Sequence, residues 1–374
     1  MLMAQYDFLI VGAGLYGAVF AHEAKKAGRR CLVVEKRTHT GGNIHCEDAD
    51  GIAVHRYGAH IFHTSDKEVW DYVTRLTDFN RFTNSPLACH KGRLYHLPFN
   101  LTTFHELWGV RTPAEAAEKL KEQRGAYAAV TPRNLEEQAL KLCGRDIYET
   151  LIKGYTEKQW GRPATELPPF IIKRVPLRLT YDNNYFDDRF QGVPVGGYNT
   201  LVDALLDGVE VRTGEDYLAH RAVYDGLAQH VVFTGCIDAY YDFREGRLDY
   251  RSLRFDTRRM ETPNFQGNAV INYTGSEVPY TRVIEHKHFD LDTPPDALPH
   301  TVVTYEYPDT FVPGKEPYYP VNDDRNSRLY AKYREMAAHE DGVSFGGRLG
   351  QYTYADMDDT VKAALSLSRK LLAQ

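Results

Sequence analysis

Three glycines and one carboxylate are the first residues of this sequence whose types and spacing could do chemistry. Gly12, Gly14 and Gly17 form a GxGxxG pattern directly after an apolar stretch, residues 6–11. In such a loop the first glycine permits a tight turn, the second lets the backbone approach a pyrophosphate, and the third lets helix and strand pack closely. Glu35 ends the next apolar stretch, where a carboxylate can accept hydrogen bonds from ribose hydroxyls. The segment predicts a dinucleotide site, with a glycine loop of purely structural origin as the alternative.

The residues after Glu35 favour FAD over NAD as the dinucleotide. Lys36 comes next, and Gly41-Gly42-Asn43 follows shortly after it. An acid followed by a GGN turn resembles flavoproteins of the glutathione-reductase and amine-oxidase type, in which the backbone passes close to the pyrophosphate and ribityl chain. A later apolar run, residues 231–235, ends in Thr-Gly and is similar to the strand that closes the FAD domain of that group. An ordinary Gly-Gly turn is the alternative.

Arginines and aromatic residues make up the remaining candidate chemistry. Guanidinium forks bind a diphosphate bidentately, at roughly 1.5–3 kcal/mol for each charged hydrogen bond. Aromatic faces stack a nucleobase for roughly 1–3 kcal/mol. A nucleotide-sugar ligand would use both groups, whereas scattered surface arginines and half-buried tyrosines are the alternative. The candidates are Tyr155, Trp160, Arg174, Arg178, Tyr185, Arg282, Tyr318, Tyr319, Arg348 and Tyr354.

Patterns for a protein nucleophile, a metal or a phosphate loop are missing from the sequence. There is no GxSxG elbow, no HExxH pair and no Walker loop. His55, His60 and His63 lack a companion carboxylate or thiol at ligand spacing, so we expect no metal site. The sequence also shows no serine, cysteine or aspartate nucleophile with an attendant base.

Helices are expected to position the aromatic residues around 155–160. Ser65-x-x-Glu68, Thr112-Pro113-x-Glu115 and Asn134-x-x-Glu137 are typical helix starts. A further helix is expected over 145–153, ended by Gly154. Two short apolar runs around His90-Lys91-Gly92-Arg93 predict a hairpin between the first two of these helices.

From about residue 248 to 321 apolar residues recur with period two, which predicts an antiparallel sheet. Strands of this sheet are expected at 250–255, 269–273, 282–289 and 301–307. After them we expect a helix at 326–338, a short strand at 343–345 and a helix at 356–372.

These patterns predict an α/β fold in which a discontinuous Rossmann-like FAD-binding domain carries an inserted helical lobe and an antiparallel β-sheet lobe. A chain of 374 residues suits more than one core, since single cores stop growing near ~250–300 residues. The expected bounds are 1–78, 196–240 and 325–374 for the FAD-binding domain, 98–170 for the helical lobe, and 79–97, 171–195 and 241–324 for the sheet domain.

Composition excludes several classes of partner. With 45 Lys+Arg against 51 Asp+Glu the formal charge is 45 − 51 = −6, so there is no basic field of the kind that nucleic acid demands. No run approaches the ~18–20 apolar residues that a membrane span needs. The five cysteines are scattered without a CxxC pair, which favours reduced thiols and a cytoplasmic location.

Several blocks of sequence together resemble the prokaryotic UDP-galactopyranose mutase family. They occur in order and at family-like spacing, and the likeness runs from residue 6 to about residue 370. One departure is Leu151-Ile152, where the family often carries phenylalanine, so uracil packing there is expected to differ in detail. The blocks are 58–64 (GAHIFHT), 154–160 (GYTEKQW), 182–186 (DNNYF), 280–287 (YTRVIEHK) and 347–358 (GRLGQYTYADMD).

The resemblance implies an FAD enzyme that interconverts UDP-galactopyranose and UDP-galactofuranose by ring contraction. In this family the flavin must be reduced, and its N5 acts as a covalent nucleophile at the anomeric carbon without net redox change. The protein then supplies position and electrostatics. That division of work agrees with the missing protein nucleophile. An external reductant such as NAD(P)H and a homodimer or higher homo-oligomer are also implied.

The resemblance also implies roles for individual residues. Arg174, on a mobile loop, and Arg282 would hold the diphosphate and stabilise charge on leaving UDP, and His63 would lie beside the flavin, with a structural histidine as the alternative. Arg348 is left open between flavin and substrate diphosphate. The implied substrate-binding residues are Tyr155, Thr156, Trp160, Arg174, Tyr185, Asn272, Arg282, Tyr319, Arg348 and Tyr354. The implied cofactor-binding residues are Gly12, Gly14, Gly17, Glu35, Lys36, Gly42, Asn43, His60, Ile61, Arg348, Asp356 and Met357.

Two other classes of protein share such a scaffold. A flavin-dependent oxidoreductase of the amine-oxidase type would consume oxygen or NAD(P)H in step with product. A non-enzymatic binding protein, like the GDP-dissociation inhibitors of small GTPases, would purify without colour. The intact glycines and Glu35 argue against the binding protein.

Overall fold

The computed structural model describes residues 4–172, 175–294 and 296–373. This part of the chain forms two compact units. Unit 1 consists of the described residues of Met1–Asn80, Arg189–Arg251 and Phe311–Gln374, and unit 2 of those of Arg81–Asp188 and Ser252–Thr310. The division into three domains stays a prediction.

Unit 1 contains a parallel sheet in the order β16-β10-β1-β2-β9. Leu9, Ile10, Leu32 and Val33 are fully buried, as expected for central parallel strands covered on both faces. Taken in chain order, the first strand lies between the second and the fourth, which is the order of the Rossmann fold. The predicted Rossmann-like α/β fold is therefore confirmed. The strands are β1 (Tyr6–Val11), β2 (Cys31–Glu35), β9 (Glu210–Thr213), β10 (Ala228–Phe233) and β16 (Val343–Phe345).

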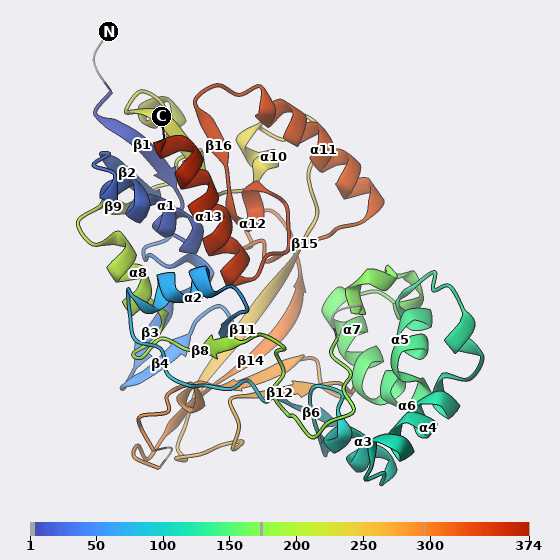
Figure 1. Ribbon diagram of the computed structural model, residues 1–374. Helices are drawn as coiled ribbons and strands as arrows, with labels where there is room; N and C mark the ends of the chain where they lie inside the picture. Colours follow the sequence, from blue (N-terminus) through green and yellow to red (C-terminus); the bar gives the residue numbers. More distant parts are fainter. Residues whose placement is uncertain (1–3, 173–174, 295, 374) are drawn as a thin grey trace. The chain divides into compact units, whose positions relative to one another are not determined.

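Helices of unit 1 pack beside this sheet. Among them α1 contacts both α13 and α8, and Figure 1 shows α1, α8 and α13 next to one another. Their bounds are α1 (Leu15–Lys26), α2 (Lys67–Thr74), α8 (Tyr198–Leu206), α9 (Arg221–Tyr224), α10 (Ile237–Tyr240), α11 (Asp324–Ala338), α12 (Gly347–Gly350) and α13 (Met357–Leu372).

Short antiparallel ladders complete unit 1. β3 pairs with β4 across the Asp50-Gly51 turn, β5 pairs with β8, and β15 pairs with the first residues of β11. The bounds are β3 (Cys46–Ala49), β4 (Ile52–His55), β5 (Phe62–Thr64), β8 (Phe190–Gly192), β11 (Tyr250–Met260) and β15 (Tyr319–Pro320), with a 3-10 turn over Gly42–Ile44.

Unit 2 contains a sheet in the order β11-β14-β13-β12-β6-β7. Its neighbours are antiparallel at β13–β14, β12–β13 and β6–β7, while β12 and β6 run parallel. The predicted hairpin and period-two strands are thus present, with one correction: residues 286–289 form a 3-10 turn instead of continuing the strand from 282. The bounds are β6 (Leu87–His90), β7 (Arg93–His96), β12 (Val270–Tyr273), β13 (Arg282–Glu285) and β14 (Thr301–Thr310).

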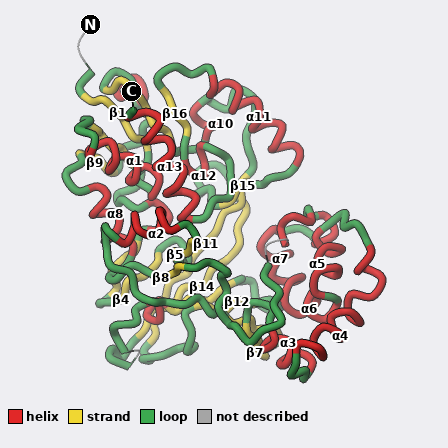
Figure 2. Tube along the Cα trace, viewed as in Figure 1, coloured by secondary structure: helices red, strands yellow, loops and turns green. Residues whose placement is uncertain are grey.

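The helices of unit 2 gather around their own core, and Figure 2 shows them as a red cluster. Phe104, Leu135 and Ile147 are fully buried in that core. The bounds are α3 (Leu101–Trp108), α4 (Pro113–Arg124), α5 (Leu135–Cys143), α6 (Arg145–Ile147), a π-helical turn (Tyr148–Ile152) and α7 (Lys153–Trp160), with 3-10 turns at Gly125–Ala129, Ala164–Glu166 and Pro169–Ile172.

Two predicted helix ends were wrong. The cap of α2 is Asp66, whose carboxylate accepts hydrogen bonds from the backbone N–H groups of Glu68 and Val69. Ser65 instead accepts a hydrogen bond from the backbone of Arg189. The helical path also continues through Gly154 and ends at Gly161, which has a left-handed φ of 65°. Gly154 serves close packing, because a Cβ there would lie 2.2 Å from the carbonyl oxygen of Thr274.

Candidate functional site

The GxGxxG loop of unit 1 has the geometry of a phosphate cradle. Gly12 follows β1 with a φ of +106°, and a Cβ there would lie 2.1 Å from Oγ1 of Thr234. A Cβ on Gly17 would lie 2.0 Å from the carbonyl oxygen of Gly12. Gly14 is the extended cap residue at the start of α1. The loop therefore brings the N-terminus of α1 to the carboxyl ends of β1 and β10, where doubly wound sheets bind dinucleotides.

The second glycine pair lies against the first loop. Gly41 donates its backbone N–H to the carbonyl of Ala13 at 2.8 Å. Gly42 has a φ of +55°, and a Cβ there would lie 2.9 Å from the Cα of Gly14. Asn43 accepts a hydrogen bond from Arg37 at 3.1 Å. The predicted GGN turn thus packs on the GxGxxG loop, and a side chain at Gly42 would collide with the backbone of Gly14.

Glu35 is held firmly at the end of β2. The residue is 6% exposed, and its carboxylate accepts hydrogen bonds from the backbone N–H groups of Ala13, at 2.8 Å, and Arg37, at 2.9 Å. A carboxylate has further lone pairs, so these bonds leave room for a ribose hydroxyl. Lys36 and Arg37 both pair with Glu316, at 3.2 and 2.8 Å. Lys36 is therefore placed beside the end of β2 but in an ion pair.

The histidine segment runs beside the β3–β4 ladder. Nδ1 of His60 lies 2.8 Å from the carbonyl of Gly58, and the backbone N–H of His60 donates to Nδ1 of His55. Ile61 is half-buried, and His63 lies in β5 opposite Gln191. Within the described residues, no group of His, Cys, Asp and Glu is arranged to hold a metal ion.

Arg348 gathers two of the predicted tyrosines in unit 1. Its guanidinium carbon lies 5.3 Å from the ring centroid of Tyr319 and 5.5 Å from that of Tyr354, and these rings stack with centroids 5.8 Å apart. Nη2 of Arg348 donates to the carbonyl of Tyr318 at 2.6 Å. Nε is buried and has no hydrogen-bond partner among the described residues. A buried donor of this kind is costly without a partner, so the cluster suits an anionic or polar ligand.

Asp356 and Met357 lie where the sequence places them, at the start of α13. Asp356 is the cap residue, and its backbone carbonyl accepts a hydrogen bond from the N–H of Thr360 at 3.0 Å. The N-terminus of this long helix carries positive partial charge and favours anionic groups nearby.

Arg282 forms a polar cluster on one face of the sheet of unit 2. It lies opposite Asn272 on β12 and opposite Glu306 on β14, so the three side chains share a face. Nε and Nη2 of Arg282 lie 2.9 and 2.8 Å from Oε1 of Glu306, whose side chain is fully buried. Oδ1 of Asn272 and Oε2 of Glu306 are buried without a hydrogen-bond partner among the described residues. These oxygens leave the cluster incomplete without a ligand or water.

Tyr185, another predicted residue of unit 2, is close enough to Arg282 for the charge of Arg282 to act on its pKa. Burial raises the pKa of Tyr185, and the charge of Arg282 acts in the opposite direction. The backbone of Tyr185 is anchored to the carbonyl of Asn84 at 2.8 Å. Arg178 donates to the carbonyls of Asn184 and Tyr185 and pairs with Asp187 at 2.5 Å.

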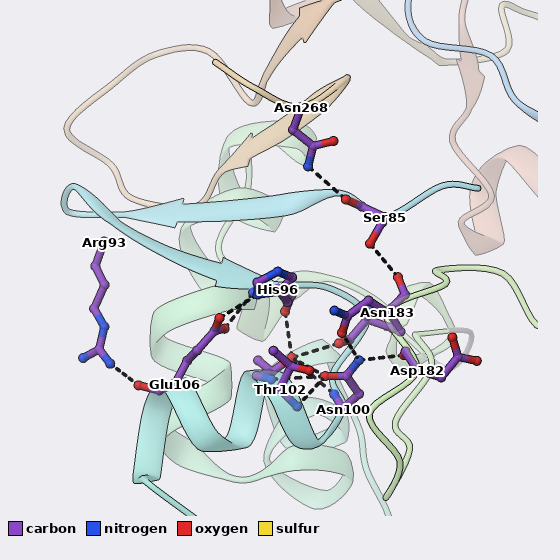
Figure 3. Close-up of polar contacts among 11 residues, drawn as sticks. Ser85, Arg93, His96, Asn100, Thr102, Glu106, Asp182, Asn183 and Asn268 are labelled. Carbon is purple, nitrogen blue, oxygen red and sulfur yellow. Dashed lines mark hydrogen bonds and ion pairs between the residues drawn. The ribbon is translucent and has the colours of Figure 1, made fainter. Parts of the chain in front are cut away.

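A second set of contacts fastens the same loop, and Figure 3 shows it. Asn100 caps α3 and donates to the carbonyl of Asp182 and to Oδ1 of Asn183, both at 2.7 Å. Ser85 donates to the carbonyl of Asn183 at 3.0 Å and accepts through its own carbonyl from Asn268. The loop that presents Tyr185 is therefore tied to several elements of unit 2.

The aromatic residues of the nucleotide side lie on α7. Thr156 and Trp160 are one helical turn apart and share a face, while Tyr155 lies beside them; all are half-buried. Trp160 packs against the helical core of unit 2. Arg174 lies outside the described residues.

The structure thus brings the predicted residues together in two groups. Unit 1 holds the glycine loops, Glu35, the histidine segment and the cluster of Arg348, Tyr319 and Tyr354. Unit 2 holds α7, Tyr185 and the cluster of Arg282 and Asn272. Sequence reasoning missed Glu306, whose only signal was a carboxylate inside an otherwise apolar and β-branched strand pattern.

Fold and site together define an α/β protein with a Rossmann-type dinucleotide unit. Residues 10–76 match the family described as a NAD(P)-binding Rossmann-like domain, and residues 150–354 match the family described as UDP-galactopyranose mutase. The chain therefore belongs to the UDP-galactopyranose mutase family, and the predicted class of flavin-dependent isomerase is confirmed.

Individual relatives agree with this family. The chain is 36% identical over 376 residues to a Klebsiella pneumoniae protein named "Probable UDP-galactopyranose mutase", which covers 99% of this chain and 96% of that protein. It is 37% identical over 368 residues to the dTDP-fucopyranose mutase of Escherichia coli, covering 96% and 97%. The fold is similar to a crystal structure of reduced UDP-galactopyranose mutase, with a TM-score of 0.74, 16% identity, and coverage of 98% and 96%.

No helix within the described residues is long and apolar enough to cross a membrane.

Proposed function

We propose that this protein interconverts UDP-galactopyranose and UDP-galactofuranose, using bound FAD that is active when reduced. The observation that carries the substrate side is the cluster of Arg282, Asn272 and Glu306, which joins a guanidinium to buried oxygens that lack a partner among the described residues. Such a cluster suits a ligand that combines a diphosphate with hydroxyl groups.

Residues of unit 1 would hold FAD. Gly12, Gly14 and Gly17 would leave space for the pyrophosphate at the start of α1, and Glu35 would accept a ribose hydroxyl. Gly42 with Asn43, the segment His60-Ile61, and Asp356 with Met357 would contact the rest of the cofactor. When bound and reduced, the flavin supplies N5 as the nucleophile for the anomeric carbon, without net redox change.

The remaining residues would bind the substrate and stabilise charge. Arg282 and Arg174 would neutralise the diphosphate as UDP leaves, because guanidinium groups stabilise negative charge where it develops. Tyr155, Thr156 and Trp160 would line the nucleoside side, and Tyr185, Tyr319 and Tyr354 would reach phosphate oxygens. Arg348 stays open between flavin and diphosphate, and His63 would tune the flavin or relay a proton.

Three further features belong to the proposal. They are a homodimer or higher homo-oligomer, a cytoplasmic location, and an external reductant such as NAD(P)H.

A second substrate pair is favoured by one specific comparison. The relative that is named dTDP-fucopyranose mutase matches nearly the whole chain, at an identity close to that of the relative with the UDP-galactopyranose name. The two sugar nucleotides share the diphosphate that Arg282 would hold, so the Arg282 cluster suits either. The nucleobase and the sugar substituents must distinguish them.

The test is a product analysis with purified protein. UDP-galactofuranose and dTDP-fucofuranose are incubated separately with the protein, with and without dithionite, and the products are separated by HPLC. Formation of UDP-galactopyranose only in the reduced sample supports the proposal. Conversion of the dTDP sugar alone would replace UDP-galactose by dTDP-fucose as substrate. A bound, reducible flavin with no conversion, but with oxygen or NAD(P)H consumed in step with another product, would support the amine-oxidase-type alternative.

A further inference from the structure

Helix α7 is fastened to the loop that connects β12 to β13, residues 274–281. Gly154 allows close packing at one end, since a Cβ there would lie 2.2 Å from the carbonyl oxygen of Thr274. Oγ1 of Thr274 donates to the carbonyl of Thr150 at 2.7 Å, in the π-helical turn just before α7. Both elements belong to unit 2.

Lys158 makes the central contact between them. Its Nζ donates to the backbone carbonyls of Tyr273 at 2.8 Å, Val278 at 3.2 Å and Tyr280 at 2.9 Å. These carbonyls come from both ends of the loop, so one ammonium group closes it across its width. Burial lowers the pKa of Lys158 to about 8, while the charge of Glu277 in the loop acts in the opposite direction. The lysine is therefore a half-buried tie, unlike a surface charge.

The loop held by Lys158 leads directly into the diphosphate cluster. Tyr273 donates its backbone N–H to the carbonyl of Thr281 at 2.8 Å, which closes the loop at its base. The next residues outward on the two strands are Asn272 and Arg282, which lie opposite each other. A shift of the loop base would therefore move both side chains of the cluster.

The same lysine lies on the helix that carries the nucleotide-side residues. Tyr155, Thr156 and Trp160 occupy α7 within one turn of Lys158. A backbone carbonyl that loses its donor in a half-buried site must find water or move, so the position of α7 against the loop depends on this contact.

We propose that Lys158 is a positioning residue, which holds α7 and Arg282 at the separation that a nucleoside diphosphate spans. Lys158 acts through these elements and does not itself contact the reacting atoms. This inference rests on the proposed function, because it assigns α7 to the nucleoside and Arg282 to the diphosphate.

The test compares Lys158→Met with wild type in UDP binding and turnover. Methionine keeps the length of the side chain and removes the donors. We expect the Kd for UDP, measured by calorimetry, and the KM for the sugar nucleotide to rise at least tenfold. The flavin absorbance of each purified protein should stay equal, because the cofactor residues lie in unit 1.

Lys287 offers a matched control. Its Nζ also donates to backbone carbonyls of unit 2, those of Pro263, Leu298 and His300, so it ties loops together in the same way. These segments join β12, β13 and β14 at the ends of the strands away from Arg282. Lys287→Met should lower the melting temperature, as Lys158→Met does, while its Kd for UDP stays within twofold of wild type. An unchanged Kd in Lys158→Met, or an equal rise in Lys287→Met, would overturn the inference.

A milder variant covers the case in which Lys158→Met does not fold. Thr274→Val keeps Lys158 and removes the hydrogen bond to Thr150, together with the longer contacts of Oγ1 to the carbonyl of Cys89 and to Nδ1 of His90. We expect a threefold or larger rise in the Kd for UDP. No rise in that variant would count against the inference. Wild-type protein that binds UDP but does not interconvert either sugar pair would refute the proposed function, and the UDP titrations would still test the role of Lys158.

Discussion

Replacement of Glu306 by glutamine removes the charge that faces Arg282 and keeps the shape of the side chain. Removing one partner of a buried ion pair costs about 3–5 kcal/mol, because the other charge is left uncompensated. Arg282 keeps 23% of its side chain in solvent, and an amide oxygen can still accept its hydrogen bonds. We therefore expect a smaller loss of unfolding free energy, about 1–3 kcal/mol.

The effect on turnover follows from the direction of the guanidinium. Oε1 of Glu306 accepts from two nitrogens of Arg282, which fixes the plane of the group. If Arg282 stabilises charge on leaving UDP, poorer alignment of its guanidinium should cost about 1–3 kcal/mol of transition-state stabilisation. Such a loss lowers kcat/KM by roughly 5- to 150-fold. A role in substrate binding alone would instead raise KM and leave kcat unchanged.

The assay combines urea unfolding with steady-state turnover measured by HPLC. Glu285→Gln is the matched control, since Glu285 is also fully buried, accepts the backbone N–H groups of Phe265 and Gln266, and lies on the same strand as Arg282. It should lose stability while kcat/KM stays within twofold of wild type. A Glu306→Gln variant with wild-type stability and kcat/KM would refute the reasoning, as would an equal loss of activity in the control.

Three further predictions test the cofactor loop, the sheet core and the substrate loop. Gly42→Ala should purify with little flavin absorbance, because the φ of +55° disfavours a side chain and its Cβ would meet the phosphate loop; full absorbance would contradict this. Burial lowers the pKa of His286 to about 3, so the unfolded chain takes up a proton below about pH 6.5 while the folded chain stays neutral there. Its contribution to the unfolding free energy is therefore complete above about pH 6.5 and falls by up to about 1.4 kcal/mol per pH unit towards pH 3. Urea unfolding at several pH values should show that His286→Gln lacks this part of the pH dependence. Asn100→Ala should lower the unfolding free energy by about 2–4 kcal/mol, since it removes a helix cap and the hydrogen bonds to Asp182 and Asn183. A change below about 0.5 kcal/mol would exclude that role.

Local patterns predicted the strand, turn and helix around the GxGxxG loop correctly. The spacing of Gly12, Gly14 and Gly17 requires a strand before it and a helix after it, and both are present. The caps at Thr112 and Asn134 were also predicted correctly, because a cap depends only on residues within one turn. The cap of α2 was placed one residue early, since serine and aspartate are neighbours there and both can cap.

Contacts between distant segments were beyond the reach of local patterns. Gly154 has the residue type that usually ends a helix, yet α7 continues through it because the carbonyl of Thr274 packs there. Glu306 was missed because only the register of β13 against β14 places it opposite Arg282. Hydrophobic alternation predicts which face a residue takes, but it does not predict which residue of the next strand it meets.

The sequence by itself therefore determined the Rossmann order of elements, the glycine turns and the family, because these depend on residue types at short and regular spacing. Only the tertiary structure decided that Glu306 and Asn272 flank Arg282 and that Lys158 joins α7 to the loop between β12 and β13. The physical reason is that hydrogen bonds between segments more than a hundred residues apart, such as those from Lys158 to Tyr273 and Tyr280, depend on sheet register and helix packing.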